Sequence, residues 1–169
     1  QQSSNKGIAE FVPSGYVANQ NTDGTYTVDR EYISVEATGA DSKENRQILS
    51  DAINATAGNS FLQLSEGTYK MPSISAAKEF TIVGTEDTII DVTKGAYMDS
   101  STVAFEGVTI KGSTDYVYDD NGNKGSDYAA LYTPNVTYTN CTFDGPFRIG
   151  RDGATFINCT FTNLGNDYV

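Results

Sequence analysis

The segment TYTNCTF at residues 137–143 returns eighteen residues later as TFINCTF at residues 155–161. Both copies place an aromatic residue two positions before an asparagine and a Cys-Thr-Phe run directly after it. Side chains alternate along a strand, so each copy predicts two short strands that meet at the asparagine. A repeat of this length cannot enclose a core alone, so we expect each copy to bury its apolar side chains against the next.

The same pattern continues upstream when the chain is aligned on Asn140 and Asn158, with Gly107 and Gly84 at the equivalent positions. Asparagine and glycine tolerate the positive φ that a sharp bend between strands often needs. The pattern predicts an all-β parallel β-helix, whereas the alternative, an antiparallel sandwich, would not need a repeating bend residue. The positions expected to face inward are Val103, Phe105, Val108, Ile110, Val136, Tyr138, Cys141, Phe143, Ala154, Phe156, Cys159 and Phe161.

A long gap between two bend residues predicts a loop insertion at about residues 112–128, with a hairpin turn at Asn121-Gly122. Tyrosine rings stack on sugars and also form hydrogen bonds, so this insertion is a candidate ligand-binding site. The candidate ligand-binding residues are Tyr116, Tyr118, Asp119 and Asp120. The outward strand positions Thr139, Thr142, Ile157 and Thr160 form an alternative binding surface.

Oxygen-bearing side chains at Asp119, Asn121 and Asn123 have the alternate spacing of a calcium loop. Lys124 and Ala130 stand where an EF-hand loop has glycine and glutamate, so that motif is not matched. We therefore favour a polar turn and expect no cofactor, with Ca²⁺ as the alternative.

The chain has 169 residues, a formal net charge of −11 and no histidine. An acidic surface repels phosphate backbones, so nucleic acid is excluded as a partner. No apolar run approaches the roughly 20 residues that span a bilayer. The chain begins with Gln1, which indicates a processed or trimmed product without its signal peptide or anchor.

Two cysteines, Cys141 and Cys159, occupy the same inward position of neighbouring copies. We favour two free thiols that act as small apolar core residues. A disulfide between neighbouring strands stays open as the alternative.

The N-terminal part predicts three elements. Residues 1–30 form a hairpin segment, because alternating runs flank the turn Asn21-Thr22-Asp23-Gly24. A helix at about residues 42–56 follows Asp41, and Glu44 completes a capping box. The remaining domain, residues 31–169, is expected to be the β-helix, with this helix covering its first end.

The run Gly39-Ala40-Asp41, the apolar residues Ile48 and Ala52-Ile53, and the turn Leu64-Ser65-Glu66-Gly67-Thr68-Tyr69 resemble the opening segment of the pectate-lyase-like superfamily. The match covers about residues 33–72, and the repeats extend it to residue 169. The resemblance implies a right-handed, single-stranded parallel β-helix with an N-terminal capping helix. The superfamily includes lyases, hydrolases, phage tailspikes and non-catalytic surface proteins, so the resemblance implies no particular activity.

Residues 11–18 and 23–28 resemble a recurring segment of large modular cell-surface proteins of Gram-positive gut-type bacteria. This implies an extracellular or cell-surface location and a chain cut from a longer protein. We accordingly expect truncation at the C-terminus, where the open end would stack on further coils or another chain.

The connection from Asp144 to Asp152 holds the only candidate catalytic set in this reading. If the chain is an enzyme, Arg148 or Arg151 is the basic group and Asp144 and Asp152 hold a cation, as in the lyases that it resembles. Charged residues in such a turn are more often solvated ion pairs, so we favour no catalytic residues.

These patterns predict a non-catalytic extracellular module of a bacterial surface protein, an adhesin or stalk that binds a host or cell-surface glycan or protein. The alternative is a fragment of a polysaccharide lyase or glycosidase.

Overall fold

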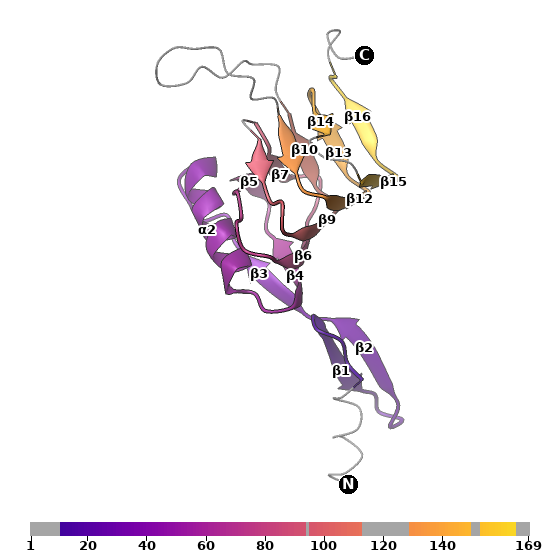
Figure 1. Ribbon diagram of the computed structural model, residues 1–169. Coiled ribbons are helices and arrows are strands. Elements are labelled where there is room, and N and C mark those ends of the chain that lie inside the picture. Colours follow the sequence, from indigo (N-terminus) through magenta and orange to yellow (C-terminus); the bar gives the residue numbers. More distant parts are fainter. Residues whose placement is uncertain (1–10, 94, 113–128, 150–152, 165–169) are drawn as a thin grey trace.

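The computed structural model describes residues 11–93, 95–112, 129–149 and 153–164 (Figure 1). Sixteen strands of this part of the chain form four sheets. The six-stranded parallel sheet has the order β15 (Ala154–Ile157), β12 (Asn135–Thr139), β9 (Thr102–Glu106), β6 (Glu79–Val83), β4 (Asn59–Leu64) and β3 (Tyr32–Val35). The five-stranded parallel sheet has the order β16 (Thr160–Thr162), β13 (Thr142–Asp144), β10 (Thr109–Lys111), β7 (Thr88–Asp91) and β5 (Gly67–Lys70).

Two smaller sheets complete the set. The three-stranded parallel sheet has the order β14 (Arg148–Ile149), β11 (Ala130–Tyr132) and β8 (Ala96–Tyr97). The hairpin β1 (Tyr16–Gln20) and β2 (Tyr26–Arg30) is antiparallel and projects from the rest of the molecule (Figure 1).

The predicted fold class, an all-β right-handed single-stranded parallel β-helix, is wrong. The parallel strands are divided among separate sheets of three, five and six strands, and none of these sheets is closed or wound into a solenoid. A 14-residue helix also belongs to the body, so the architecture is mixed α/β. The sequence repeat predicts which residues of neighbouring strands lie side by side and where the chain bends. It does not determine how the strands are divided among sheets.

The register between neighbouring strands is the one that the repeat predicts. Val136 and Tyr138 pair with Ala154 and Phe156, and Phe143 pairs with Phe161. The same positions continue into β9 and β10, which align with β12 and β13. Of the predicted outward positions, Ile157 and Thr160 are exposed and Thr139 and Thr142 are half-buried, whereas the inward neighbours of the last two, Tyr138 and Phe143, are buried.

The predicted bend residues hold equivalent places. The backbone N–H groups of Gly84, Gly107 and Asn140 donate to the residue just before the next bend, at 3.1, 3.0 and 2.9 Å. Asn140 and Asn158 have φ of 54° and 51°, as expected for a left-handed bend. Gly84 differs, because its φ is not positive and a Cβ there would lie 2.6 Å from the Thr88 hydroxyl oxygen.

The core is an aromatic stack between the sheets. Tyr138 lies between Phe105 and Phe156, with ring centroids 5.3 Å away on each side. Phe143 stacks on Phe161 at 4.8 Å and meets Tyr138 edge-on at 4.9 Å. Offset and edge-on pairs of this kind contribute about 0.5–1.5 kcal/mol each beyond their buried area.

The helix α2 (Ser42–Ala55) begins where the sequence predicts. The Asp41 carboxylate accepts from the Glu44 N–H at 2.8 Å, as in a capping box, whereas the Glu44 carboxylate accepts from the N–H of Ala40, one residue before the cap, at 2.6 Å. Leu49 and Ile53 are fully buried, and the helix packs against β5 and β3. Fourteen residues that include Lys43 and Glu44 are too short and too polar to cross a bilayer, and the described residues contain no helix that could.

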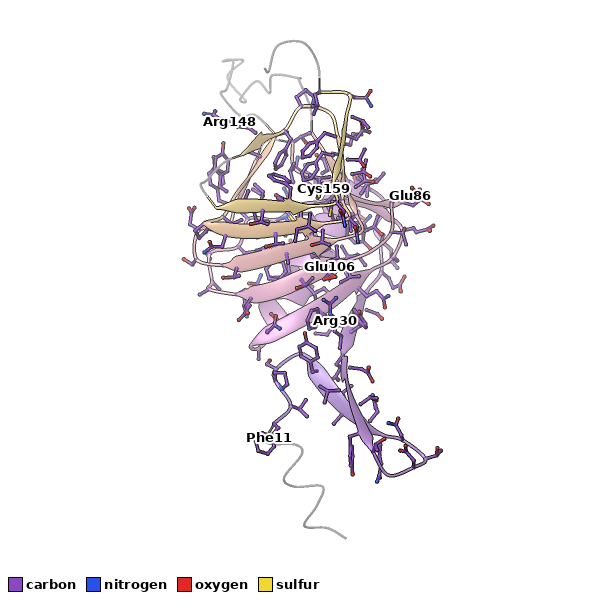
Figure 2. All side chains as sticks on the ribbon, turned by 90° about the vertical axis from the view of Figure 1, so that its right-hand side faces the viewer. Phe11, Arg30, Glu86, Glu106, Arg148 and Cys159 are labelled. Atoms are coloured by element: carbon purple, nitrogen blue, oxygen red, sulfur yellow. The ribbon has the colours of Figure 1, made fainter. Side chains whose placement is uncertain are left out.

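The hairpin is held by its second strand. Arg30 of β2 lies beside Glu106 of β9 (Figure 2), and its Nη1 donates to the two carboxylate oxygens at 3.0 and 2.9 Å. The Arg30 guanidinium also lies 4.3 Å from the Phe61 ring centroid. The hydrogen bonds to Glu106 raise the pKa of Arg30 above its ordinary value. Tyr16 adds an edge-on contact with Phe61 at 5.3 Å. The predicted hairpin is therefore confirmed over residues 16–30 and is anchored to the six-stranded sheet, whereas residues 1–10 of the predicted segment lie outside the described residues.

Cys141 and Cys159 are both free thiols. The Cys141 thiol donates to the Phe105 carbonyl oxygen at 3.5 Å, and the Cys159 thiol donates to the Tyr138 carbonyl oxygen at 3.3 Å. Burial raises the pKa of Cys141 to about 11. The interpretation of the cysteines as small core residues is confirmed for Cys141, which is buried.

Asn140 tests the role of the bend. We expect Asn140→Val to lower the free energy of unfolding by about 1–2 kcal/mol, because a β-branched residue is strained at positive φ. Asn140→Gly is the control and should stay within about 0.5 kcal/mol of the natural chain. Asn140 is exposed, so lost packing contributes little. Urea unfolding measures the free energy of unfolding of both variants. Equal stability of the two variants would contradict the assignment of Asn140 as a bend residue.

Tyr138 tests the core. Its hydroxyl is buried and has no hydrogen-bond partner among the described residues, and burial raises its pKa. We expect Tyr138→Phe to stabilise the protein by about 1 kcal/mol, because removing an unsatisfied buried polar group relieves its desolvation cost. Thermal unfolding measures this, with Phe105→Tyr as the reverse control. A loss of stability in Tyr138→Phe would show that the hydroxyl has a partner.

Candidate functional site

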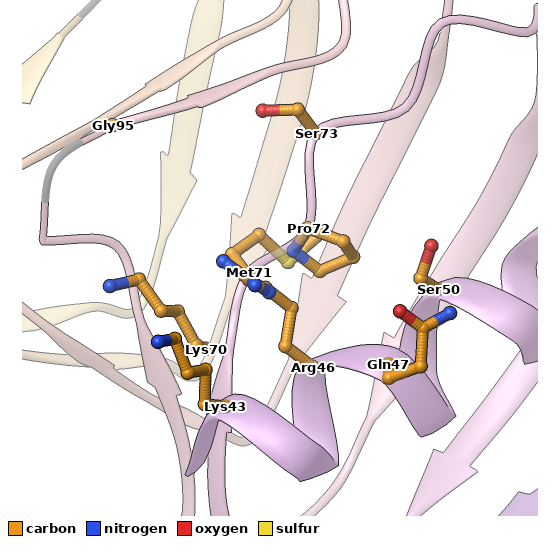
Figure 3. A pocket seen from close by; sticks show the side chains of 9 residues that line it. All are labelled: Lys43, Arg46, Gln47, Ser50, Lys70, Met71, Pro72, Ser73 and Gly95. Carbon is orange, nitrogen blue, oxygen red and sulfur yellow. The ribbon is translucent and has the colours of Figure 1, made fainter.

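A pocket of about 400 Å³ lies where α2 meets the end of β5 (Figure 3). Three cationic side chains line it: Lys43 and Arg46 from the helix and Lys70 from β5. Ser50 and Ser73 add hydroxyl groups. In a chain with 22 acidic and 11 basic residues, three cations around one pocket form a local concentration of positive charge.

The helix is fixed beside β5 by Asn45, which is buried. Its amide donates to the Thr68 carbonyl oxygen at 3.0 Å and accepts from the Gly39 N–H at 2.8 Å. The first bond ties the first turns of α2 to β5, the strand that carries Lys70, and the second ties them to the segment that precedes the helix. Asn45 thereby places the neighbouring Arg46 at the mouth of the pocket.

The opposite wall is formed by residues 71–73, which come directly after β5 in the chain and are hydrogen-bonded to β8. The Ser73 hydroxyl oxygen accepts from the Tyr97 N–H at 3.0 Å, and the Ile74 N–H donates to the Tyr97 carbonyl oxygen at 2.9 Å. Met71 is buried beneath the pocket wall. The Ser73 hydroxyl keeps its hydrogen for donation to a ligand.

A pair of tyrosines stands beside this wall. The rings of Tyr97 and Tyr132 stack with centroids 4.5 Å apart and an interplanar angle of 6°. A Cβ on Gly95, which lines the pocket, would lie 3.0 Å from the Tyr132 ring. Glycine at this position lets the Tyr132 ring lie over the backbone beside the pocket.

The three pocket cations differ in whether an opposite charge lies close to them. Within the described ranges, neither Lys43 nor Arg46 has an ion-pair partner. Lys70 lies beside Asp91 of the neighbouring strand, so its charge is partly balanced. This is part of a row in which Lys70, Asp91, Lys111 and Asp144 alternate in sign across β5, β7, β10 and β13.

A second pocket of about 420 Å³ lies at the other end of the helix, and its single lysine is already engaged in hydrogen bonds. Its lysine, Lys78, donates to the carbonyl oxygens of Asn54 and Thr56 at 3.1 and 2.8 Å. These bonds satisfy the last carbonyls of α2. Lys78 therefore has a structural role, and the first pocket is the better candidate site.

The chemistry that the first pocket offers is binding of an anion. Ammonium and guanidinium groups with nearby hydroxyl donors suit a carboxylate, sulfate or phosphate group. In the described residues no group of three or more acidic, histidine or cysteine side chains could hold a metal ion.

Comparison with known proteins adds nothing to this assignment: no family model, curated protein or solved structure matches the chain.

The candidate catalytic set is only partly described. Arg151 and Asp152 lie outside the described residues. Arg148 is exposed on β14, whereas Asp144 ends β13 in a different sheet and accepts from the Asn163 amide at 2.7 Å.

The predicted insertion, apart from Gly112, lies outside the described residues. This range includes the candidate ligand-binding residues Tyr116, Tyr118, Asp119 and Asp120 and the candidate metal ligands Asp119, Asn121 and Asn123. These assignments stay predictions.

Sequence reasoning missed the pocket, because its cations come from separate segments at residues 43–46 and 70. Lys43 and Arg46 are three residues apart on the predicted helix, which places them on one side of it. That spacing was the only local signal, and the approach of Lys70 depends on the packing of α2 on β5.

Gly95 tests the wall beside the tyrosine pair. We expect Gly95→Ala to lower the free energy of unfolding by about 1–2 kcal/mol, because φ is +74° and the new Cβ presses on the Tyr132 ring. In a Tyr132→Ala background the same change should cost less, since only the backbone strain is left. Chemical denaturation of the four proteins measures the difference. Equal losses in both backgrounds would contradict the ring contact.

Proposed function

We propose that this chain is a non-catalytic extracellular module of a bacterial surface protein and that it binds a cell-surface glycan. The observation that carries the proposal is the pocket lined by Lys43, Arg46 and Lys70, with the stacked tyrosines beside it, of which Tyr97 is exposed and Tyr132 half-buried. Cationic, hydroxyl and aromatic groups together suit recognition of a sugar that carries a negative charge.

The surroundings of the pocket support binding. Its size falls in the range of about 300–1,000 Å³ that is usual for small-molecule sites. Its cationic residues stand on a capped helix that is bonded to β5 and on β5 itself, so their backbone positions are fixed before a ligand arrives. The resemblance of residues 11–18 and 23–28 to modular surface proteins supports the proposed location.

The test is a panel of immobilised glycans with the full 169-residue chain, followed by product analysis. We expect retention on at least one glycan with a Kd of about 1 mM or tighter, and neither unsaturated uronate nor new reducing ends after prolonged incubation. Retention on no glycan would contradict the proposal. Product formation that is lost in Arg148→Ala or Arg151→Ala would instead support a polysaccharide lyase or glycosidase.

A further inference from the structure

Two pocket cations are available to a ligand. Lys43 is exposed and Arg46 is half-buried, and neither has an ion-pair partner in the described parts of the chain. They lie three residues apart on α2 and line the same pocket (Figure 3). A group with two or three negatively charged oxygens can therefore be held by an ammonium and a guanidinium at once, and the guanidinium fork matches such a group in two places.

The tyrosine pair is oriented for a second contact. Tyr132 lies on β11 and covers one face of the Tyr97 ring, whereas Ser73 and Ile74 are bonded to the opposite edge of β8. These bonds place Tyr97 next to the pocket wall that carries Ser73. Tyr97 is 47% exposed, so part of its aromatic side chain is accessible to solvent beside that wall.

The charge of the whole chain limits the charge density of the ligand. With 22 acidic residues against 11 basic ones, the protein repels a densely charged polyanion outside the pocket. A ligand with one acidic group on an otherwise neutral chain gains the pocket contacts without this repulsion. Surface charges interact over about 10 Å at 0.1 M salt, so most of this repulsion acts close to the pocket.

We propose that the pocket binds a sparsely charged oligosaccharide, with its single carboxylate or sulfate held by Lys43 and Arg46 and its neighbouring neutral sugar against the exposed part of the Tyr97 side chain. This inference rests on the proposed glycan binding and specifies its ligand. Ser50 and Ser73 supply hydroxyl groups for the sugar. A carboxylate and a sulfate share the chemistry that the pocket recognises, and the experiment separates them.

The experiment is titration calorimetry of the full chain with five probes: 3′-sialyllactose, lactose 3′-sulfate, lactose, inorganic sulfate and a heparin-derived tetrasaccharide. We expect at least one of the two acidic lactoses to bind about 10-fold or more tightly than lactose, and their ratio tells whether carboxylate or sulfate is preferred. Inorganic sulfate should bind more weakly, because it does not reach Tyr97. The heparin fragment should bind no tighter than the better acidic lactose, despite its higher charge.

Variants locate the site. Arg46→Ala should weaken the better acidic lactose about 10-fold or more, and Arg46→Lys should restore part of the loss. Tyr97→Ala should weaken it about 5-fold and leave inorganic sulfate unchanged. Lys111→Ala is the control, because it removes one positive charge from an exposed lysine that does not line the pocket and lies two strands from Lys70, and it should change the affinity less than 2-fold.

Several outcomes would overturn the inference. Lactose binding as tightly as both acidic lactoses would mean that the anion is not recognised. An equal loss in Arg46→Ala and Lys111→Ala would mean that only net charge matters. Tightest binding by the heparin fragment would reject a sparsely charged ligand. If the panel of glycans retains the chain but neither acidic lactose binds, this inference fails while the proposed binding function stands. Circular dichroism of each variant confirms that the fold is kept.

Discussion

Neighbouring parallel strands in this protein must keep one register, because the same inward position of each strand supplies one member of a continuous stack. Phe105, Tyr138 and Phe156 form such a stack across β9, β12 and β15. A shift of one residue would turn every ring of a strand outward, since side chains alternate. The bends at Gly107 and Asn140 keep this register as the chain passes from the six-stranded to the five-stranded sheet.

The pocket depends on the same constraint. Lys70, the last residue of β5, faces outward because side chains alternate along the strand and Tyr69 is buried. The segment after β5 then reaches β8, where the Tyr97 N–H donates to the Ser73 hydroxyl oxygen and the Tyr97 carbonyl oxygen accepts from the Ile74 N–H. Asn45 attaches the helix α2 to β5, because its amide donates to the Thr68 carbonyl oxygen. Residues far apart in the sequence thus meet at one place, although none of them belongs to a recognisable motif.

Local features were predictable from the sequence and the larger arrangement was not. The hairpin, the capped helix and the pairing of Tyr138 with Phe156 follow from turn residues, a capping box and a short repeat, which act over a few residues. The fold class was wrong, because a repeat does not determine how strands are divided among sheets. The pocket was missed, since the approach of Arg46 to Lys70 is a result of packing.

Phe161 also differs from its equivalent Phe143. Phe161 is 46% exposed, because β16 is the last strand of its sheet.

The alternating row of Lys70, Asp91, Lys111 and Asp144 has a consequence for how such a protein can lengthen. Opposite charges on adjacent strands attract, and like charges repel by a similar amount. Duplication of a single strand-forming unit within the row would place two lysines or two aspartates side by side. Duplication of two successive units would preserve the alternation. Growth by gene duplication is therefore favoured in even steps along this face, and Thr162 of β16, which follows Asp144 in the row, is a neutral position from which either sign can continue.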